Sequence, residues 1–245
     1  MYQYGADFYG FLASFALASA RKVVPLVGAA LPVRSVVDFG CGHCAWLRVW
    51  QDSGAAVAGV DGPYVETGDV LIDPGCFRAA DLAAPIDLGR RFDLVQSLEV
   101  AEHLPAAAAG NFVDMLVAHG PVVLFSAAVP GQGGENHVNE RPPEYWRGLF
   151  HARGYVPIDY LRPLIVGDPE VAPWYRYNML LYAAEGLVAA LPEALRSRLV
   201  PETEALRDYR PLPCRLRQAL VRQLPPAAVN RIARLRSSGL RSSRV

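Results

Sequence analysis

Short apolar runs alternate with stretches of helical spacing along the middle of the chain, from about residue 35 to residue 184. Runs that are rich in β-branched and other apolar residues predict buried strands. The predicted strands are 35–38, 56–60, 77–80, 92–98, 122–126, 155–160 and 176–183. Helices are predicted between them at 45–52, 105–119 and 142–153. This alternation indicates an α/β fold with a mainly parallel sheet.

The segment before the first strand, residues 1–33, is predicted to be an N-terminal helical cap. Apolar residues recur there at helical spacing, for example Phe8 and Phe15. The helix is expected over residues 7–30, and Pro25 predicts a break near its end. The cap therefore precedes the sheet as one or two helices.

The segment after the last strand, residues 185–245, combines helical spacing with an excess of arginine. Helices are predicted at 187–199 and 214–224, with disorder after residue 237. The last 60 residues hold twelve arginines and four acidic residues, although the formal charge of the whole chain is zero. This charge suggests an anionic partner, such as a membrane surface or nucleic acid. A solvated, partly helical tail that balances an acidic body is the favoured interpretation.

The turn after the first predicted strand contains two glycines. Gly40 and Gly42 let the backbone adopt positive φ and let a ligand approach without a Cβ in the way. A helix follows, and its N-terminal amides face the same place. These features predict a small-molecule site at the carboxyl end of a strand, where open α/β sheets bind ligands.

The residues around these glycines distinguish two cofactor classes. A dinucleotide-binding turn has three glycines in the pattern G-x-G-x-x-G, but the third position here is Ala45. Asp38 stands two residues before the first glycine, and its carboxylate would repel a pyrophosphate. A nicotinamide oxidoreductase is therefore disfavoured. The stretch from Asp38 to Gly42 instead resembles motif I of class I S-adenosylmethionine (SAM) dependent methyltransferases.

This resemblance has consequences for the fold and for the cofactor. It implies a Rossmann-like, seven-stranded, mostly parallel sheet with helices on both faces, over residues 34–184. The last strand of the sheet is antiparallel in that family. The resemblance also implies that Asp38, Gly40 and Gly42 face the methionine end of SAM.

Acidic residues stand at the ends of the next two predicted strands. Asp61, followed by Gly62, comes about 20 residues after the glycine turn, where an acid can accept hydrogen bonds from both ribose hydroxyls. By resemblance to the methyltransferases, Asp81 bonds the adenine amine, and the backbone at Leu82 bonds a ring nitrogen. Ser97 lies in the fourth strand, in the segment that flanks the transferred methyl group in this family.

Glu99, Glu102 and His103 follow the fourth predicted strand. If these residues form one helical turn, their spacing places them on one face. Two carboxylates and an imidazole predict a site for a divalent ion, namely Mg²⁺, Mn²⁺, Fe²⁺ or Zn²⁺. The same Glu-x-x-Glu-His pattern resembles ubiquinone-biosynthesis and small-RNA 2′-O-methyltransferases, in which it holds a metal. A structural or acid–base role without a metal is the favoured interpretation of these residues.

A glycine-rich loop, residues 131–142, follows the fifth predicted strand. The fourth and fifth strands are expected to be neighbours, so His137 in this loop is predicted to lie near His103. It is a candidate fourth metal ligand or general base, and it shares the predicted reaction centre with His103 and Glu99. The polar residues 139–141 are predicted to orient a polar acceptor.

Composition and motifs together define the predicted activity. Hydrophobic residues make up 52% of the chain, and the four cysteines do not suggest a disulfide framework. Reduced thiols, with no predicted signal peptide or membrane span, favour a cytoplasmic enzyme. The prediction is SAM-dependent methyl transfer to a small polar acceptor, through an oxygen of a sugar or secondary metabolite. RNA 2′-O-methylation, and a SAM-binding or scaffold protein that docks through its basic tail, are the alternatives.

Overall fold

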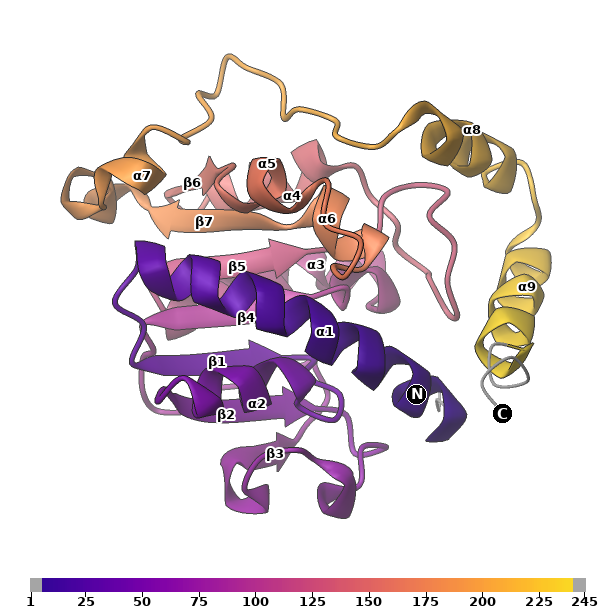
Figure 1. Cartoon of the computed structure of the whole chain (residues 1–245), viewed down its shortest axis with the longest axis horizontal. Helices are drawn as coiled ribbons and strands as arrows, with labels where there is room; N and C mark the ends of the chain where they lie inside the picture. Colours follow the sequence, from indigo (N-terminus) through magenta and orange to yellow (C-terminus); the bar gives the residue numbers. More distant parts are fainter. Residues whose placement is uncertain (1–5, 240–245) are drawn as a thin grey trace.

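In the computed structural model, which describes the backbone of residues 6–239 and the side chains of residues 15–235, seven strands form one sheet. Their order is β3-β2-β1-β4-β5-β7-β6 (Figure 1). The bounds are β1 Ser35–Phe39, β2 Ala56–Asp61, β3 Phe77–Ala79, β4 Leu94–Leu98, β5 Val122–Ser126, β6 Tyr155–Ile158 and β7 Leu180–Ala184. Neighbouring strands from β3 to β5 are parallel, whereas β7 is antiparallel to β5 and β6. The predicted mostly parallel, seven-stranded α/β fold is confirmed.

Helices cover both faces of this sheet (Figure 1). One face carries α1 Ala6–Ala30, α2 Ala45–Asp52, α5 Leu161–Ile165 and α6 Pro173–Asn178, and the other carries α3 Ala109–His119 and α4 Pro143–His151. Successive strand residues point to opposite faces, so Val36 packs with the first group of helices and Val37 with the second. Both valines are completely buried. Burial of such a side chain contributes about 1.5–3 kcal/mol to folding.

The first helix differs from its prediction, because α1 continues through Pro25 instead of breaking there. A proline inside a helix removes one backbone hydrogen bond. The nearby side chains of Val23, Val24 and Val27 are almost completely buried in the core. We attribute the unbroken helix to this packing, since tertiary contacts of the apolar face supply most of a helix's stability.

A helix also replaces the beginning of the seventh predicted strand. Residues 173–178 form α6, and β7 begins only at Leu180, so the predicted strand is wrong at residues 176–179. Pro173 occupies the first turn of α6, where its fixed φ and missing N–H are tolerated. Tyr175 packs edge-on against Trp46, with ring centroids 5.1 Å apart. Tertiary packing therefore outweighs the strand propensity of these aromatic residues.

The chain after β7 is largely helical. A 3₁₀ segment, Glu185–Ala190, and α7 Glu193–Arg196 lead back to β6, and α8 Leu212–Val221 and α9 Pro226–Gly239 follow. The disorder predicted for residues 237–245 is wrong at residues 237–239, which belong to α9, and residues 240–245 lie outside the described part of the chain. Helices α8 and α9, called the arm below, lie at the right of Figure 1, on the side to which the strands β1 and β4 point, and α9 contacts α1. Among the described helices, none combines the length and apolar character that crossing a bilayer requires.

Candidate active site

A cavity of about 1250 Å³ lies at the carboxyl ends of β1, β2 and β4. The glycine turn after β1, the ends of β2 and β4, and the segment after β3 form one part of its wall. The glycine-rich loop after β5, helix α6 and the arm form the rest. The site predicted at the strand ends therefore coincides with a cavity larger than the roughly 300–1,000 Å³ of an ordinary small-molecule pocket.

The glycine turn brings the chain close to the segment after β4. Gly40 has φ +87° and Gly42 has φ +51°, a region that favours glycine. A Cβ on Gly40 would collide with both methyl groups of Val100. Helix α2 begins just beyond the turn, after Cys44, and Ala45 and Trp46 of its first turn line the cavity. Positive φ and the contact with Val100 together require a glycine at position 40.

We expect Gly40→Ala to destabilise the protein more than Gly54→Ala. Both glycines have φ near +90°, but nothing lies within 4 Å of a Cβ placed on Gly54. Gly54→Ala should therefore cost only the backbone strain, about 1–2 kcal/mol. The collision with Val100 should add about 1–3 kcal/mol at Gly40. Urea unfolding of both variants measures the difference, and equal losses would contradict the role given to Val100.

Asp38, at the end of β1, carries an unused buried carboxylate oxygen. The side chain is almost completely buried and lines the cavity. Its Oδ2 accepts a hydrogen bond from Gln96 Nε2 at 2.8 Å, but its Oδ1 has no hydrogen-bond partner among the described residues. Burial raises the pKa of Asp38 to about 8, against the opposing effect of the Gln96 hydrogen bond. Buried polar atoms normally have partners, so Oδ1 is suited to receive a donor from a ligand.

Asp61, at the end of β2, joins this strand to the glycine turn. Its Oδ2 accepts from Gly42 N at 2.6 Å, and its Oδ1 accepts from Gly62 N at 2.6 Å and from Tyr64 Oη at 2.8 Å. Burial raises the pKa of Asp61, although these hydrogen bonds act in the opposite direction. Tyr64 lines the cavity beside Asp61. An isolated tyrosine after a turn gives no recognisable signal in a sequence, so Tyr64 was not among the predicted site residues.

The remaining predicted cofactor residues lie in two different environments. Asp81 and Leu82 line the cavity just after β3, where the Asp81 carboxylate accepts a hydrogen bond from Ala83 N at 3.0 Å. Asp81 is exposed and Leu82 is buried. Ser97 is completely buried within β4 and is not among the described residues that line the cavity. The structure therefore brings Asp81 and Leu82, but not Ser97, to the cavity with the glycine turn.

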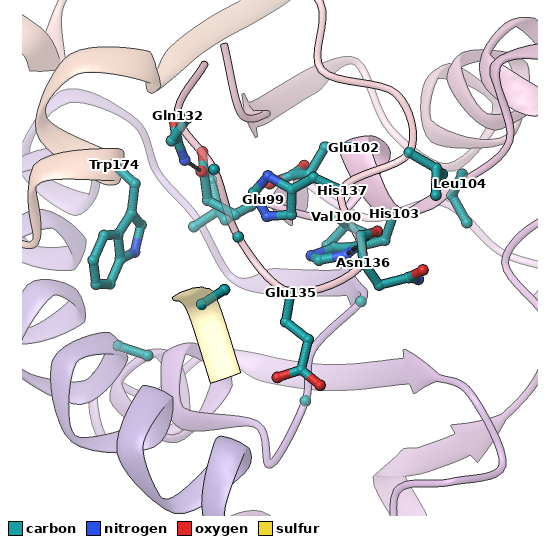
Figure 2. Close-up of a pocket in the computed structure, with 18 of the residues that line it drawn as sticks. Glu99, Val100, Glu102, His103, Leu104, Gln132, Glu135, Asn136, His137 and Trp174 are labelled. Atoms are coloured by element: carbon teal, nitrogen blue, oxygen red, sulfur yellow. Dashed lines mark hydrogen bonds between the residues drawn. The ribbon is translucent and has the colours of Figure 1, made fainter. Parts of the chain in front are cut away.

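The predicted helical turn over residues 99–103 is wrong at its beginning. Glu99 has φ +57°, outside helical geometry, and a 3₁₀ turn forms only at Ala101–His103. The Glu99 carboxylate instead accepts a hydrogen bond from Gln132 Nε2 at 2.6 Å (Figure 2). It also accepts one from Asn178 Nδ2 at 3.3 Å. Burial raises the pKa of Glu99. This residue therefore connects the end of β4 to the glycine-rich loop and to α6.

Three of the four predicted metal-ligating residues come together. Glu102, His103 and His137 offer ligand atoms that all lie within 4.8 Å of one another, and Glu99 is not part of this group. Figure 2 shows the two histidine rings next to each other, and their centroids are 4.9 Å apart. Burial, followed by the effect of His137, lowers the pKa of His103 to about 3. The imidazole of His103 is therefore neutral near pH 7, as a metal ligand must be.

Glu102 is the second buried acid with unused oxygens. It is completely buried, and neither carboxylate oxygen has a hydrogen-bond partner among the described residues. Burial raises its pKa, and the neighbouring charge of Glu99 raises it further. The backbone carbonyl of Glu102 accepts hydrogen bonds from the amides of Val138 and Asn139, which fixes the glycine-rich loop beside it. A cation or a hydrogen-bond donor would complete the environment of this carboxyl group.

Glu140 orients His137. His137 Nδ1 lies 2.8 Å from Glu140 Oε1, and the same carboxylate accepts from Gly131 N at 2.7 Å and from Gly133 N at 2.8 Å. Although burial acts to raise it, these hydrogen bonds lower the pKa of Glu140 below its usual value. A proton on Nδ1 leaves the Nε2 lone pair of His137 available as a base or ligand.

Asn139 and Arg141, two further polar residues of the loop, contact neighbouring parts of the protein. Asn139 is buried, and its Nδ2 donates to Ala101 O at 3.4 Å. Arg141 is exposed; it donates to Asn139 Oδ1 at 2.8 Å and lies over the ring of Tyr145. Residues 139–141 are not among the described residues that line the cavity. The prediction that they orient an acceptor is therefore wrong, because their side chains hold the loop and its histidine in place.

The arm packs on the glycine-rich loop and closes that side of the cavity. A Cβ on Gly131, which has φ +79°, would collide with the Gln218 carbonyl of α8. Polar contacts join the two segments: Arg217 to Gln132 O at 2.6 Å, Arg222 to Pro130 O at 2.9 Å, Asn136 N to Asn230 at 2.7 Å, and Arg234 to Glu135 at 3.3 Å. Part of the positive charge that predicted an external anionic partner thus serves contacts within the chain.

Comparison with known proteins agrees with this geometry. Residues 13–126 match a protein family described as "Methyltransferase domain". This match covers just under half of the chain and identifies that part of it as similar to a methyltransferase domain. No curated protein sequence matches this methyltransferase. The predicted resemblance to class I SAM-dependent methyltransferases is confirmed, while the narrower resemblance to enzymes with a Glu-x-x-Glu-His pattern stays a prediction.

Solved structures share the fold of this methyltransferase at low sequence identity. The sugar N-methyltransferase KedS8 from Streptoalloteichus sp. is 20% identical, with 68% of this chain and 87% of that chain covered and a TM-score of 0.53. Magnesium protoporphyrin IX methyltransferase (ChlM) from Synechocystis, solved with bound SAM, is 18% identical, with coverage of 69% and 80% and a TM-score of 0.51. The methyltransferase domain of bacterial CtHen1 is 16% identical, with coverage of 69% and 98% and a TM-score of 0.51.

Proposed function

We propose that this methyltransferase binds SAM in the cavity and transfers its methyl group to an oxygen of a small-molecule acceptor. The observation that carries the proposal is the unpartnered, buried Oδ1 of Asp38 beside the glycine turn. The α-ammonium group of SAM would supply the missing donor, and a charge-assisted hydrogen bond is the strongest kind available there. When bound, SAM supplies an electrophilic methyl group on a positively charged sulfur.

The other residues of the glycine turn and strand ends have separate roles in this proposal. Gly40 and Gly42 give the methionine end access to the backbone. The Asp61 carboxylate accepts hydrogen bonds from the ribose hydroxyls, in exchange for part of its present contacts with Gly62 and Tyr64. Asp81 and the backbone at Leu82 hold the adenine ring. Together these residues fix the reacting sulfonium end near the loop that carries His137.

We propose His137 as the general base. Glu140 accepts from Nδ1, so Nε2 can take the proton from an acceptor hydroxyl as the oxygen attacks the methyl carbon. The nearby Glu140 carboxylate stabilises the imidazolium that forms. The neutral His103 and Glu99, whose carboxylate accepts a hydrogen bond from Gln132, would orient the acceptor beside His137. In this proposal the protein therefore does two things: it aligns the acceptor with the methyl group, and it removes the proton of the acceptor hydroxyl.

A divalent ion held by Glu102, His103 and His137 is the alternative form of the same proposal. Two imidazoles and one carboxylate are ligands that Mn²⁺, Fe²⁺ and Zn²⁺ accept, whereas Mg²⁺ prefers oxygen. The fit rests on the buried Glu102 carboxylate, whose two oxygens have no described hydrogen-bond partner. A cation here would lower the pKa of an acceptor hydroxyl. His137 would then be a ligand and not the base.

Calorimetry tests the proposal directly. Titration with SAM and with its demethylated product S-adenosylhomocysteine (SAH) should each show one site per chain. Incubation with radiolabelled SAM and a panel of small hydroxylated acceptors should give a labelled product. Absence of binding by both nucleosides would overturn the proposal. Binding without methyl transfer to any acceptor would favour the scaffold alternative.

We expect the affinity for SAM to rise between pH 6 and pH 7.5. The pKa of Asp38 is about 8 in the free protein, so its carboxyl group is mostly protonated in this range and must release a proton to receive an ammonium group. Because deprotonation of Asp38 is linked to binding, the Kd for SAM should fall by up to about tenfold for each unit of pH increase. Calorimetry in two buffers of different ionisation enthalpy measures the released proton. Asp38→Asn should bind more weakly and lose this component, and an identical pH slope in both proteins would contradict the assignment.

A further inference from the structure

The inner surface of the arm is apolar where it faces the cavity. The lining residues include Val221 and Leu224, at and just after the end of α8, and Val229 and Ile232 of α9. Arg217 is the one charged residue among the described arm residues that line the cavity, and its guanidinium donates to the carbonyl of Gln132. The arm therefore offers the cavity aliphatic surface with few hydrogen-bonding groups.

This apolar surface begins at the loop that carries the proposed base. A Cβ on Gly133 would lie 3.3 Å from Val229 Cγ1 and 3.4 Å from Val221 Cγ1. The two valines thus contact the loop four residues before His137. An acceptor whose hydroxyl group reaches His137 would extend directly under these side chains.

A second wall of the cavity is aromatic. Trp174 and Tyr177 of α6 line the cavity, and Trp174 lies across it from Leu104 (Figure 2). The cavity also exceeds the volume that one ligand of ordinary size fills. Space therefore remains beside a bound nucleoside, and its walls are an aromatic helix and an aliphatic arm.

We infer that the acceptor is amphipathic: a hydroxyl-bearing polar end at His137 is joined to an aliphatic or aromatic body under the arm. This inference rests on the proposed function and narrows its substrate class. An unsubstituted sugar would lose hydrogen bonds to water against these walls without replacement, which is unfavourable. An apolar body would instead remove the valines and Trp174 from water on binding.

The test uses the full-length protein saturated with SAH and a series of n-alkyl β-D-glucosides from methyl to octyl as probes. Their Kd values are measured by equilibrium dialysis below the micelle concentration. A fully buried methylene tightens binding by about fourfold, so the octyl glucoside should bind at least about a hundredfold more tightly than the methyl glucoside. A Kd that does not change with chain length would overturn the inference.

Matched variants locate the effect. Val221→Asp should abolish most of the chain-length dependence, whereas Leu220→Asp, on the outer face of the same helix at 72% exposure, should preserve it. Val229→Thr keeps the shape of the side chain and should weaken the octyl glucoside severalfold even if Val221→Asp releases the arm. The inference would be overturned if the Kd depended on alkyl chain length as in the wild type in both valine variants. It would also be overturned if this dependence were lost in Leu220→Asp.

SAH binding separates this inference from the function on which it rests. If the wild-type protein does not bind SAH in calorimetry, the proposed function fails, and the inference fails with it. If SAH binds but the glucosides show no preference for longer chains, only the amphipathic acceptor is overturned.

Discussion

Asp61→Ala is expected to weaken SAM binding by at least about a hundredfold. In the proposed complex the carboxylate accepts two hydrogen bonds from ribose hydroxyls, and hydrogen bonds to a charged group are worth about 1.5–3 kcal/mol each. The same carboxylate also holds the amides of Gly42 and Gly62. Its removal therefore loosens the glycine turn and removes a ligand contact. Calorimetry with SAM and SAH measures the loss.

Two further variants make the Asp61 result specific. Asp69→Ala removes an exposed carboxylate from the loop after β2 and should leave the Kd for SAM unchanged. Asp61→Asn keeps one acceptor oxygen and should fall between the wild type and Asp61→Ala. Thermal unfolding of each variant without ligand shows whether the fold persists. Unchanged SAM affinity in a folded Asp61→Ala protein would remove this residue from the site.

His137→Ala is expected to lower kcat by about a hundred- to ten-thousandfold while the Kd for SAM stays unchanged. A positioned general base contributes a rate factor of this size, and His137 is outside the proposed nucleoside-binding residues. Glu140→Gln retains an acceptor for His137 Nδ1 but loses the charge that stabilises the imidazolium. Its kcat should fall by about ten- to a hundredfold. To measure kcat, the rate of SAH release is followed for each variant with the acceptor that reacts fastest among the small hydroxylated acceptors.

A chelator distinguishes the two roles proposed for His137. If His137 is the base, kcat of the wild-type protein should persist undiminished in excess chelator. In His137→Ala, the pH dependence of kcat that comes from titration of a basic group should disappear. If His137 is a ligand, the chelator should abolish activity, and Mn²⁺, Fe²⁺ or Zn²⁺ should restore it. Full activity of His137→Ala without any added ion would contradict both roles.

The sequence predicts most of the sheet and of the nucleoside end of the site, because local patterns determine both. Strand β5 and helix α2 have the predicted bounds, since an apolar run or a repeat of 3.6 residues needs no distant contact to be recognised. Asp38, Asp61 and Asp81 all line the cavity because each lies at, or just after, the carboxyl end of a parallel strand, and these strand ends share one edge of the sheet. Acceptor identity, an RNA substrate and an anionic partner of the tail stay predictions.

The rest of the site depends on contacts between distant residues. Glu99 leaves helical geometry and contacts Gln132 and Asn178, which are 33 and 79 residues away in the chain. The arm is a second example, since its arginines predict a charged surface but its valines pack on Gly133. Composition cannot show which face of a helix meets the cavity. The apolar inner surface of the arm therefore could not be predicted from the sequence alone.

The order of segments along the chain separates chemistry from recognition. The glycine turn, Asp61 and the reaction-centre residues precede Pro142, whereas α8 and α9 come after the last strand. On the inference that the arm contacts the acceptor, substitutions on the inner face of α8 and α9 would change the acceptor preference and leave the glycine turn and Asp61 untouched.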